Sequence, residues 1–143
     1  MNAFIFDIEA DGLLETATTI HCLSYYNLSD GSSGSYTNLN DIKEFIENAD
    51  VLIGHNIVRY DCPLLELLTR SHFKSVLVDT LALSWYLYPE RNLHGLESWG
   101  DDLGIAKPVI NDWKNLTQEE YIHRCEEDVK INTLLWKKMR KYL

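Results

Sequence analysis

The sequence predicts an α/β fold in which a mixed five-stranded sheet carries helices on both faces. Two apolar runs rich in β-formers lie near the N-terminus, and a dense group of turn-forming residues at 29–34 follows them. From residue 41 onward, helical periodicity alternates with short apolar runs. The first pattern is typical of an antiparallel meander, and the second is typical of parallel strands joined by helices.

The individual elements follow from apolar spacing and end signals. The predicted strands are residues 3–8, 18–26, 35–38, 51–54 and 75–78. The predicted helices are residues 41–48, a segment from 62, residues 80–87 and 93–103, and a C-terminal segment from 117. Asn40 is the expected N-cap of the first helix, Pro63 suits the first turn of the second, and Thr117 with Glu120 forms a capping-box pair.

Length and composition indicate one domain over residues 1–143. A chain of 143 residues with 45% hydrophobic content can bury a sizeable core but has no room for a second domain. The three cysteines suggest neither a disulfide framework nor a zinc site, because they are odd in number and contain no CxxC pair. The longest apolar stretch is too short to span a bilayer, so we expect a cytoplasmic protein with no membrane partner.

The net charge of −9 argues against a protein that binds long nucleic acids through a continuous basic face. That mode of binding depends on neutralising many phosphates. An enzyme that grips only the end of a strand needs few phosphate contacts, and bound divalent ions would offset several of its negative charges.

Acidic residues gather at three distant points of the chain, and the first is Asp7-Ile8-Glu9. Residues two apart on a strand point to the same side, so both carboxylates face one spot. The turn expected after Ala10 puts them at the carboxyl end of the strand, where open sheets place their ligands. The alternative is a pair of solvated acids at a strand edge.

The second point is the segment from Asn56 to Asp61, which follows a buried strand and precedes a helix. Its alternative interpretation makes Asn56 a turn residue and Asp61 a charge favoured by the helix dipole. The third point is the segment from His123 to Asp128. Five residues on an ideal helix turn these two side chains about 140° apart. A joint role therefore requires a turn or break at His123, and the alternative is two surface residues.

Together the three segments resemble the DnaQ-like, DEDD-type 3′-to-5′ exonucleases, which have a ribonuclease H-like fold. Asp7-Ile8-Glu9, Asn56 through Asp61, and His123 to Asp128 match the three exonuclease motifs in order, the last with the spacing of the histidine subclass. The sequence is also similar to the proofreading domain of phage family A DNA polymerases at residues 7–10, 78–81 and 94–100. Those domains carry a tyrosine where this chain has Arg124.

The resemblance implies a two-metal site and a set of residue roles. Two divalent ions, Mg²⁺ or Mn²⁺, are expected, with His123 as the general base. The resemblance also implies residues that hold the terminal nucleotide. His55 and His94 are the other candidates for the general base, but neither occupies the position of the histidine in the family motif. The implied metal ligands are Asp7, Glu9, Asp61 and Asp128, and the implied substrate-binding residues are Gly12, Leu13, Asn56 and Tyr60.

The expected substrate is a single-stranded or frayed 3′ end of DNA, from which nucleoside 5′-monophosphates are released. RNA or very short oligonucleotides are the second substrate class, and a degenerate domain that binds nucleic acid or a DNA polymerase without cleaving it is the third interpretation. For the substrate-binding positions, an ordinary turn at Gly12, a core leucine at Leu13 and a core aromatic at Tyr60 stay open as alternatives.

Overall fold

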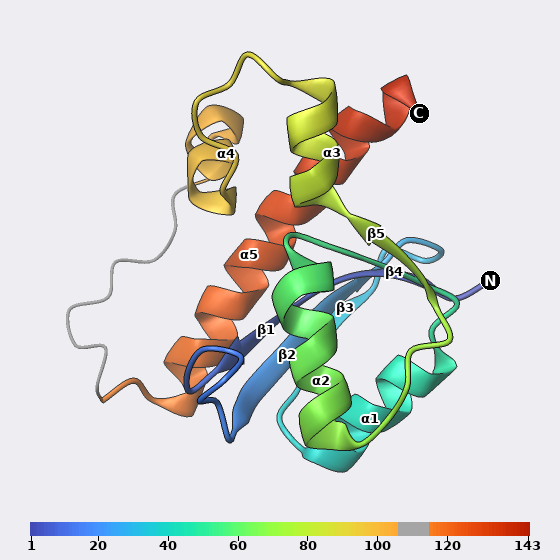
Figure 1. Cartoon of the computed structure of the whole chain (residues 1–143), viewed down its shortest axis with the longest axis vertical. Coiled ribbons are helices and arrows are strands. Elements are labelled where there is room, and N and C mark those ends of the chain that lie inside the picture. Colours follow the sequence, from blue (N-terminus) through green and yellow to red (C-terminus); the bar gives the residue numbers. More distant parts are fainter. Residues whose placement is uncertain (106–114) are drawn as a thin grey trace.

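In the computed structural model, which describes residues 1–105 and 115–143, five strands of the described chain form one sheet in the order β3-β2-β1-β4-β5. The strands are β1 Ala3–Ala10, β2 Ile20–Asn27, β3 Ser33–Tyr36, β4 Val51–Gly54 and β5 Val76–Asp79. The first three pair antiparallel, while β4 and β5 run parallel to β1. The predicted mixed five-stranded sheet is therefore confirmed (Figure 1).

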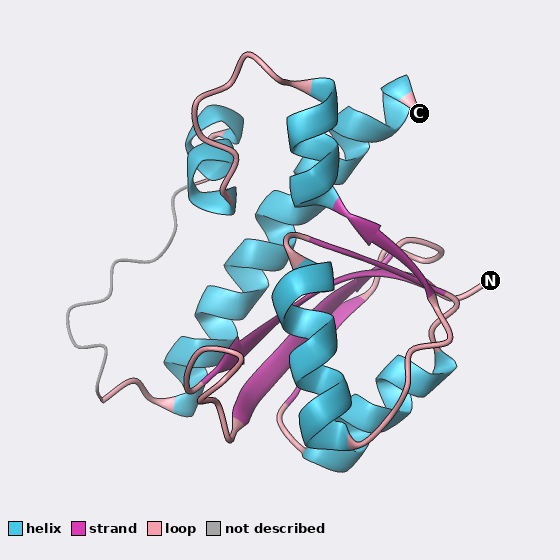
Figure 2. Cartoon of the chain, in the orientation of Figure 1, coloured by secondary structure: helices cyan, strands magenta, loops and turns pink. Residues whose placement is uncertain are grey.

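Helices cover both faces of this sheet, as predicted (Figure 2). They are α1 Leu39–Asn48, α2 Cys62–Thr69, α3 Thr80–Leu87, α4 Leu96–Leu103 and α5 Gln118–Met139, with a π-helical turn η1 at Ile57–Asp61 and a 3₁₀ turn η2 at Arg140–Tyr142. Phe6 packs with residues of α1 and α2 in one core cluster, whereas the preceding Ile5 packs with Val129 of α5 in another. Successive side chains of β1 thus fill the cores on opposite sides of the sheet.

Several predicted boundaries are wrong by two or three residues. The N-cap of α1 is Asn38 rather than Asn40, because Asn38 Oδ1 accepts hydrogen bonds from the Asn40 and Asp41 amides at 2.8 and 3.4 Å. The third strand lies at Ser33–Tyr36 rather than at 35–38, since its register is set by pairing with β2. The helix expected from residue 93 begins at Leu96.

The capping box at the start of α5 is confirmed. The Glu120 amide donates to Thr117 Oγ1 and the Thr117 amide donates to Glu120 Oε1, both at 3.2 Å. This pairing satisfies two of the backbone donors that a helix start leaves without partners. None of the helices in the described ranges has both the length and the apolar character needed to cross a lipid bilayer.

We predict that Leu135 and Leu134 of α5 respond very differently to truncation. Leu135 is fully buried, with Trp99 and Ile131 in the same cluster, whereas Leu134 is 39% exposed. Leu135→Ala should lower the free energy of unfolding by about 2–5 kcal/mol, because it removes buried methyl groups and leaves a cavity. Leu134→Ala should cost about 1 kcal/mol or less. Urea unfolding of both variants measures the difference, and equal losses would contradict this packing.

Candidate functional site

Asp7 and Glu9 lie on the part of β1 that extends beyond its parallel neighbour. The pairing of β1 with β4 covers Ala3 to Ile5, while the pairing with β2 continues to the end of the strand. Because both acids alternate with the buried Phe6 and Ile8, they point to the side of the sheet that carries α5. The strand therefore presents two carboxylates at the carboxyl end of the sheet, as the sequence predicts.

Helix α5 brings Asp128 to the same place. Cys125 Sγ donates to the backbone oxygen of Asp7 at 3.1 Å and lies 3.6 Å from Asp7 Oδ2, which fixes this part of the helix against β1. Asp128 is buried, and carboxylate oxygens of Asp7, Glu9 and Asp128 all lie within 4.8 Å of one another. Two segments far apart in the sequence thus meet at one acidic group.

Asp61 approaches from a third element. It ends η1, is 4% exposed, and its charge contributes to the environment of the Asp7 carboxyl. Its Oδ2 atom is buried and accepts no hydrogen bond from any residue that the structure describes. Asp61 does not belong to the group of three within 4.8 Å, so it lines the site from a position farther out.

The loop between β4 and η1 is held by Asp79 at the end of β5. The Asp79 carboxylate accepts from the Asn56 amide at 2.9 Å and the Val58 amide at 3.1 Å, and it also caps α3 by accepting from the Leu81 amide. Asn56 has a left-handed backbone with φ of 62°. The sequence carries no signal for the contact to the loop, because this contact depends on β4 and β5 being parallel neighbours in the sheet.

Gly54 lets η1 pack directly on β1. A Cβ atom at this position would come within 2.4 Å of Ile57 Cγ2 and 3.0 Å of the Phe6 backbone oxygen. Any larger residue would push η1, and Asp61 with it, away from the other carboxylates.

Burial and mutual repulsion raise the pKa values of two site acids. For Asp7, burial is the largest cause, and the charges of Asp128, Asp61 and Glu9 raise its pKa further. Burial also raises the pKa of Asp61, with smaller contributions from Asp79 and Glu9, although backbone hydrogen bonds from Asp61 itself and Ile8 oppose the shift. A cation beside Asp7 and Asp61 would stabilise the ionised form of both carboxylates.

The donor set fits a hard divalent cation. Ca²⁺ and Mg²⁺ are bound in proteins mainly by oxygen ligands, and carboxylates are the usual charged ones. Here three carboxylates surround one point, and the buried Asp61 Oδ2 atom beside them has no donor from the described residues. Asp7, Glu9 and Asp128 could hold an ion directly, and Asp61 could do so from its more distant position.

The break expected at His123 is wrong, because α5 is one continuous helix from Gln118 to Met139. His123 is exposed, and its place five residues before Asp128 puts it about 140° around the helix from that buried acid. Arg124, the next residue, instead faces the acidic group, and its Nε atom lies 3.2 Å from Glu9 Oε1. The sequence indicates Arg124 as a departure from the matched motif, and its spacing of four residues from Asp128 puts both side chains on one side of a continuous helix. The contact with Glu9 has no signal in the sequence.

The two rival histidines are engaged elsewhere. His55 contacts Thr80 Oγ1 at 2.9 Å and the His94 backbone oxygen at 2.7 Å, one partner for each ring nitrogen. His94 contacts Ser84 Oγ at 2.6 Å and the Arg91 backbone oxygen at 3.1 Å. These contacts tie the loop between β4 and η1 to α3 and to the segment before α4, and they leave both rings in structural roles.

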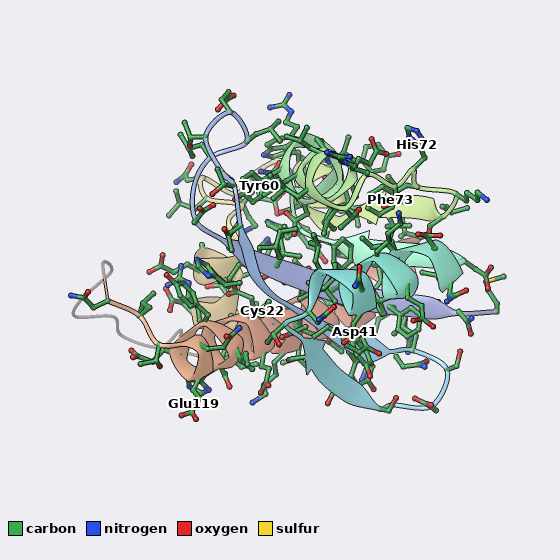
Figure 3. All side chains as sticks on the ribbon, turned by 90° about the horizontal axis from the view of Figure 1, so that it is seen from below. Cys22, Asp41, Tyr60, His72, Phe73 and Glu119 are labelled. Atoms are coloured by element: carbon green, nitrogen blue, oxygen red, sulfur yellow. The ribbon has the colours of Figure 1, made fainter. Side chains whose placement is uncertain are left out.

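The loop after β1 lies against η1. Tyr60 donates its hydroxyl hydrogen to the Gly12 backbone oxygen at 2.6 Å, and Figure 3 shows Tyr60 beside this loop. Asp11 anchors the loop by accepting from Thr18 and Thr19, and these hydrogen bonds lower its pKa to about 2. The alternative of a core leucine at position 13 is wrong, because Leu13 is 69% exposed.

Solved structures with a similar architecture belong to nucleic-acid enzymes. A family B DNA polymerase from Pyrobaculum calidifontis matches 98% of this chain with 16% identity and a TM-score of 0.73. An apo nuclease matches 97% with 16% identity and a TM-score of 0.72, and NrnC from Brucella melitensis bound to pGG matches 97% with 15% identity and a TM-score of 0.69. The chain has a ribonuclease H-like fold.

The match covers different fractions of the three solved chains. The ribonuclease H-like chain spans 24% of the polymerase, 72% of the apo nuclease and 74% of NrnC. No protein-family model and no curated protein sequence matches it. At these identities the likeness concerns the fold, and the chemistry of the site has to be argued from its residues.

We predict that Asp7→Asn raises the melting temperature of the metal-free protein by several degrees near neutral pH. The raised pKa means that the folded state keeps a proton on Asp7 at pH values where the unfolded chain has lost it. The free energy of unfolding therefore falls as pH rises above the ordinary aspartate pKa of about 3.9. The variant lacks this loss, so its advantage should be small near pH 4 and should grow toward pH 7.

Thermal melts in the presence of a chelator measure this difference. Asp101→Asn is the matched control, since it removes one negative charge from an exposed position on α4. An Asp7→Asn advantage that does not change with pH would contradict the assigned cause.

Proposed function

We propose that the protein is a divalent-metal-dependent 3′-to-5′ exonuclease that hydrolyses phosphodiester bonds and releases nucleoside 5′-monophosphates. The observation that carries this proposal is the meeting of Asp7, Glu9 and Asp128 oxygens within 4.8 Å, with the buried Asp61 beside them. A module that only binds nucleic acid gains nothing from gathering negative charge where phosphates approach. A site that holds cations between its acids and a phosphate requires this arrangement.

The four carboxylates would hold two divalent ions, Mg²⁺ or Mn²⁺. Asp7, Glu9 and Asp128 would serve as direct ligands, and Asp61 would contribute to holding the second ion from its more distant position. When bound, such a pair supplies the positive charge that stabilises the attacking and leaving oxygens of a phosphoryl transfer. The protein contributes rigid ligands, since Cys125 and the core under β1 fix the two elements that carry them.

The loop after β1 and the turn at η1 form the place for the terminal nucleotide. The exposed Leu13 side chain offers an apolar surface for a base, and Gly12 offers main chain next to it. Tyr60 holds Gly12 in position and can flank the substrate with its ring. Asn56, at the strained turn beside η1, completes the set of substrate-binding residues.

A frayed or single-stranded 3′ end of DNA is the substrate we favour, in a proofreading role beside a DNA polymerase. The likeness to a family B DNA polymerase supports it, as do the phage polymerase-like stretches of the sequence. A second candidate is a nuclease for very short oligonucleotides, which the likeness to NrnC bound to pGG favours. Both candidates use the same carboxylates.

We predict metal-dependent loss of the terminal nucleotide from labelled substrates. Purified protein should shorten 5′-labelled single-stranded DNA stepwise in Mg²⁺ or Mn²⁺, and chelation should stop the reaction. Asp7→Ala and Asp128→Ala should each lower the rate more than about 100-fold, because loss of a direct ligand costs more than the 10–100-fold typical of an outer-shell change. Asp101→Ala is the matched control with an exposed acid.

The substrate panel separates the candidates. Single-stranded DNA, duplex DNA with a mismatched 3′ end, RNA and a 5′-phosphorylated dinucleotide are compared at equal concentration. A strong preference for the dinucleotide selects the second candidate over the first. Failure to shorten any of the four in either metal would reject the nuclease proposal.

We propose His123 as the general base. Because His123 is exposed on α5 and points away from Asp128, this role requires a change in the conformation of the helix. For the imidazole to reach the attacking water, the first turns of α5 must open when substrate binds. If it acts so, His123→Ala should lower kcat about 100-fold or more while leaving metal affinity unchanged. His72→Ala, which removes another exposed histidine, is the control. Full kcat in His123→Ala would assign proton removal to another group.

A further inference from the structure

Arg124 places a positive charge inside the acidic group. Its Nε atom donates to Glu9 Oε1 at 3.2 Å, and the side chains of Arg124 and Glu9 are only 20% and 17% exposed. An ion pair with so little solvent is held more firmly than a surface pair, because less water competes for either partner. The contact therefore belongs to the site rather than to the protein surface.

The position of Arg124 on α5 explains why it reaches Glu9. Arg124 precedes Asp128 by four residues, so the two side chains lie on the same side of the helix. Cys125, between them in sequence, fixes this turn of α5 to the Asp7 backbone. The guanidinium and the Asp128 carboxylate are thus neighbours along the helix, and both face the carboxylates of β1.

A divalent ion and the Arg124 guanidinium would compete for the Glu9 carboxylate. One Glu9 oxygen lies within 4.8 Å of oxygens of Asp7 and Asp128, and the guanidinium already donates to Glu9 Oε1. Two cations at that separation in a partly buried site repel each other strongly. Binding of the ion should therefore release Arg124 from Glu9.

After its release from Glu9, the Arg124 side chain is well suited to bind a phosphate group. The planar guanidinium matches phosphate oxygens with paired hydrogen bonds, which a lysine ammonium cannot do. The substrate of the proposed reaction brings such a group to the carboxylates, so a short movement of Arg124 is enough to change partners.

We propose that Arg124 exchanges partners during binding: it neutralises Glu9 before a divalent ion arrives, and it binds a phosphate oxygen of the terminal nucleotide after the ion has taken Glu9. This inference rests on the proposed function, since it concerns the same site. It makes Arg124 both a built-in competitor of the metal and a substrate-binding residue.

Calorimetric titrations with Mn²⁺ alone, and then with thymidine 5′-monophosphate in saturating Mn²⁺, test the exchange. Arg124→Gln should bind Mn²⁺ at least about threefold more tightly than the wild type, because competition and repulsion are gone. It should bind the monophosphate at least about tenfold more weakly, because a charged hydrogen bond is lost. Arg140→Gln removes one positive charge from the exposed end of α5 and should change neither affinity.

Arg124→Lys adds a second variant that keeps the charge. Its Mn²⁺ affinity should stay near that of the wild type. Its affinity for the monophosphate should fall, because a lysine ammonium lacks the paired N–H donors of the planar guanidinium. Asp7→Ala shows whether the titrated Mn²⁺ is bound at the acidic group, and thermal melts verify that each variant is folded.

The outcomes separate this inference from the proposed function. Equal or weaker Mn²⁺ binding by Arg124→Gln overturns the competition, and unchanged monophosphate binding overturns the transfer to phosphate. In either case wild-type Mn²⁺ binding that is lost in Asp7→Ala leaves the proposed metal site intact. Absence of Mn²⁺ binding by the wild type would reject both proposals together.

Discussion

Electrostatic repulsion among carboxylates at the end of β1 is the constraint on which the arrangement of this protein depends. Burial already disfavours ionised Asp7, and Asp128, Asp61 and Glu9 add their charges to the same small volume. Such a group persists only where the surrounding structure holds it. The core clusters on both faces of the sheet, the Cys125 contact with β1 and the close packing of η1 on Gly54 together provide that support.

Much of the fold could be predicted from the sequence because each element carries its own local signal. The apolar run of β-formers in β1, the capping box of Thr117 with Glu120 and the helix after Pro63 depend on neighbours along the chain. The start of β3 at Ser33 was harder to predict, because strand register depends on the partner strand rather than on the segment itself. Asn38 and Asn40 are the same residue type two positions apart, so the sequence alone does not decide which of them caps α1.

The site was predictable as a set of acids and not as a geometry. Strand alternation relates Asp7 to Glu9, and on a continuous helix the four-residue spacing relates Arg124 to Asp128, but no local rule brings these residues of α5 to β1. The contact of Asp79 with the loop at Asn56 likewise exists only because β4 and β5 are neighbours in the sheet. The capping box of Thr117 with Glu120 favours a helix that continues through residue 123, and on such a helix His123 points away from Asp128.

The long separation along the chain between Asp7 and Asp128 also has a consequence for biosynthesis. While the ribosome is still making α3 and α4, β1 can pair with β2, but its two acids have no partner from α5. The acidic group is complete only after α5 has emerged and docked, since contacts between distant segments form late and slowly. A nascent chain therefore lacks the assembled acidic group until α5 has docked on β1.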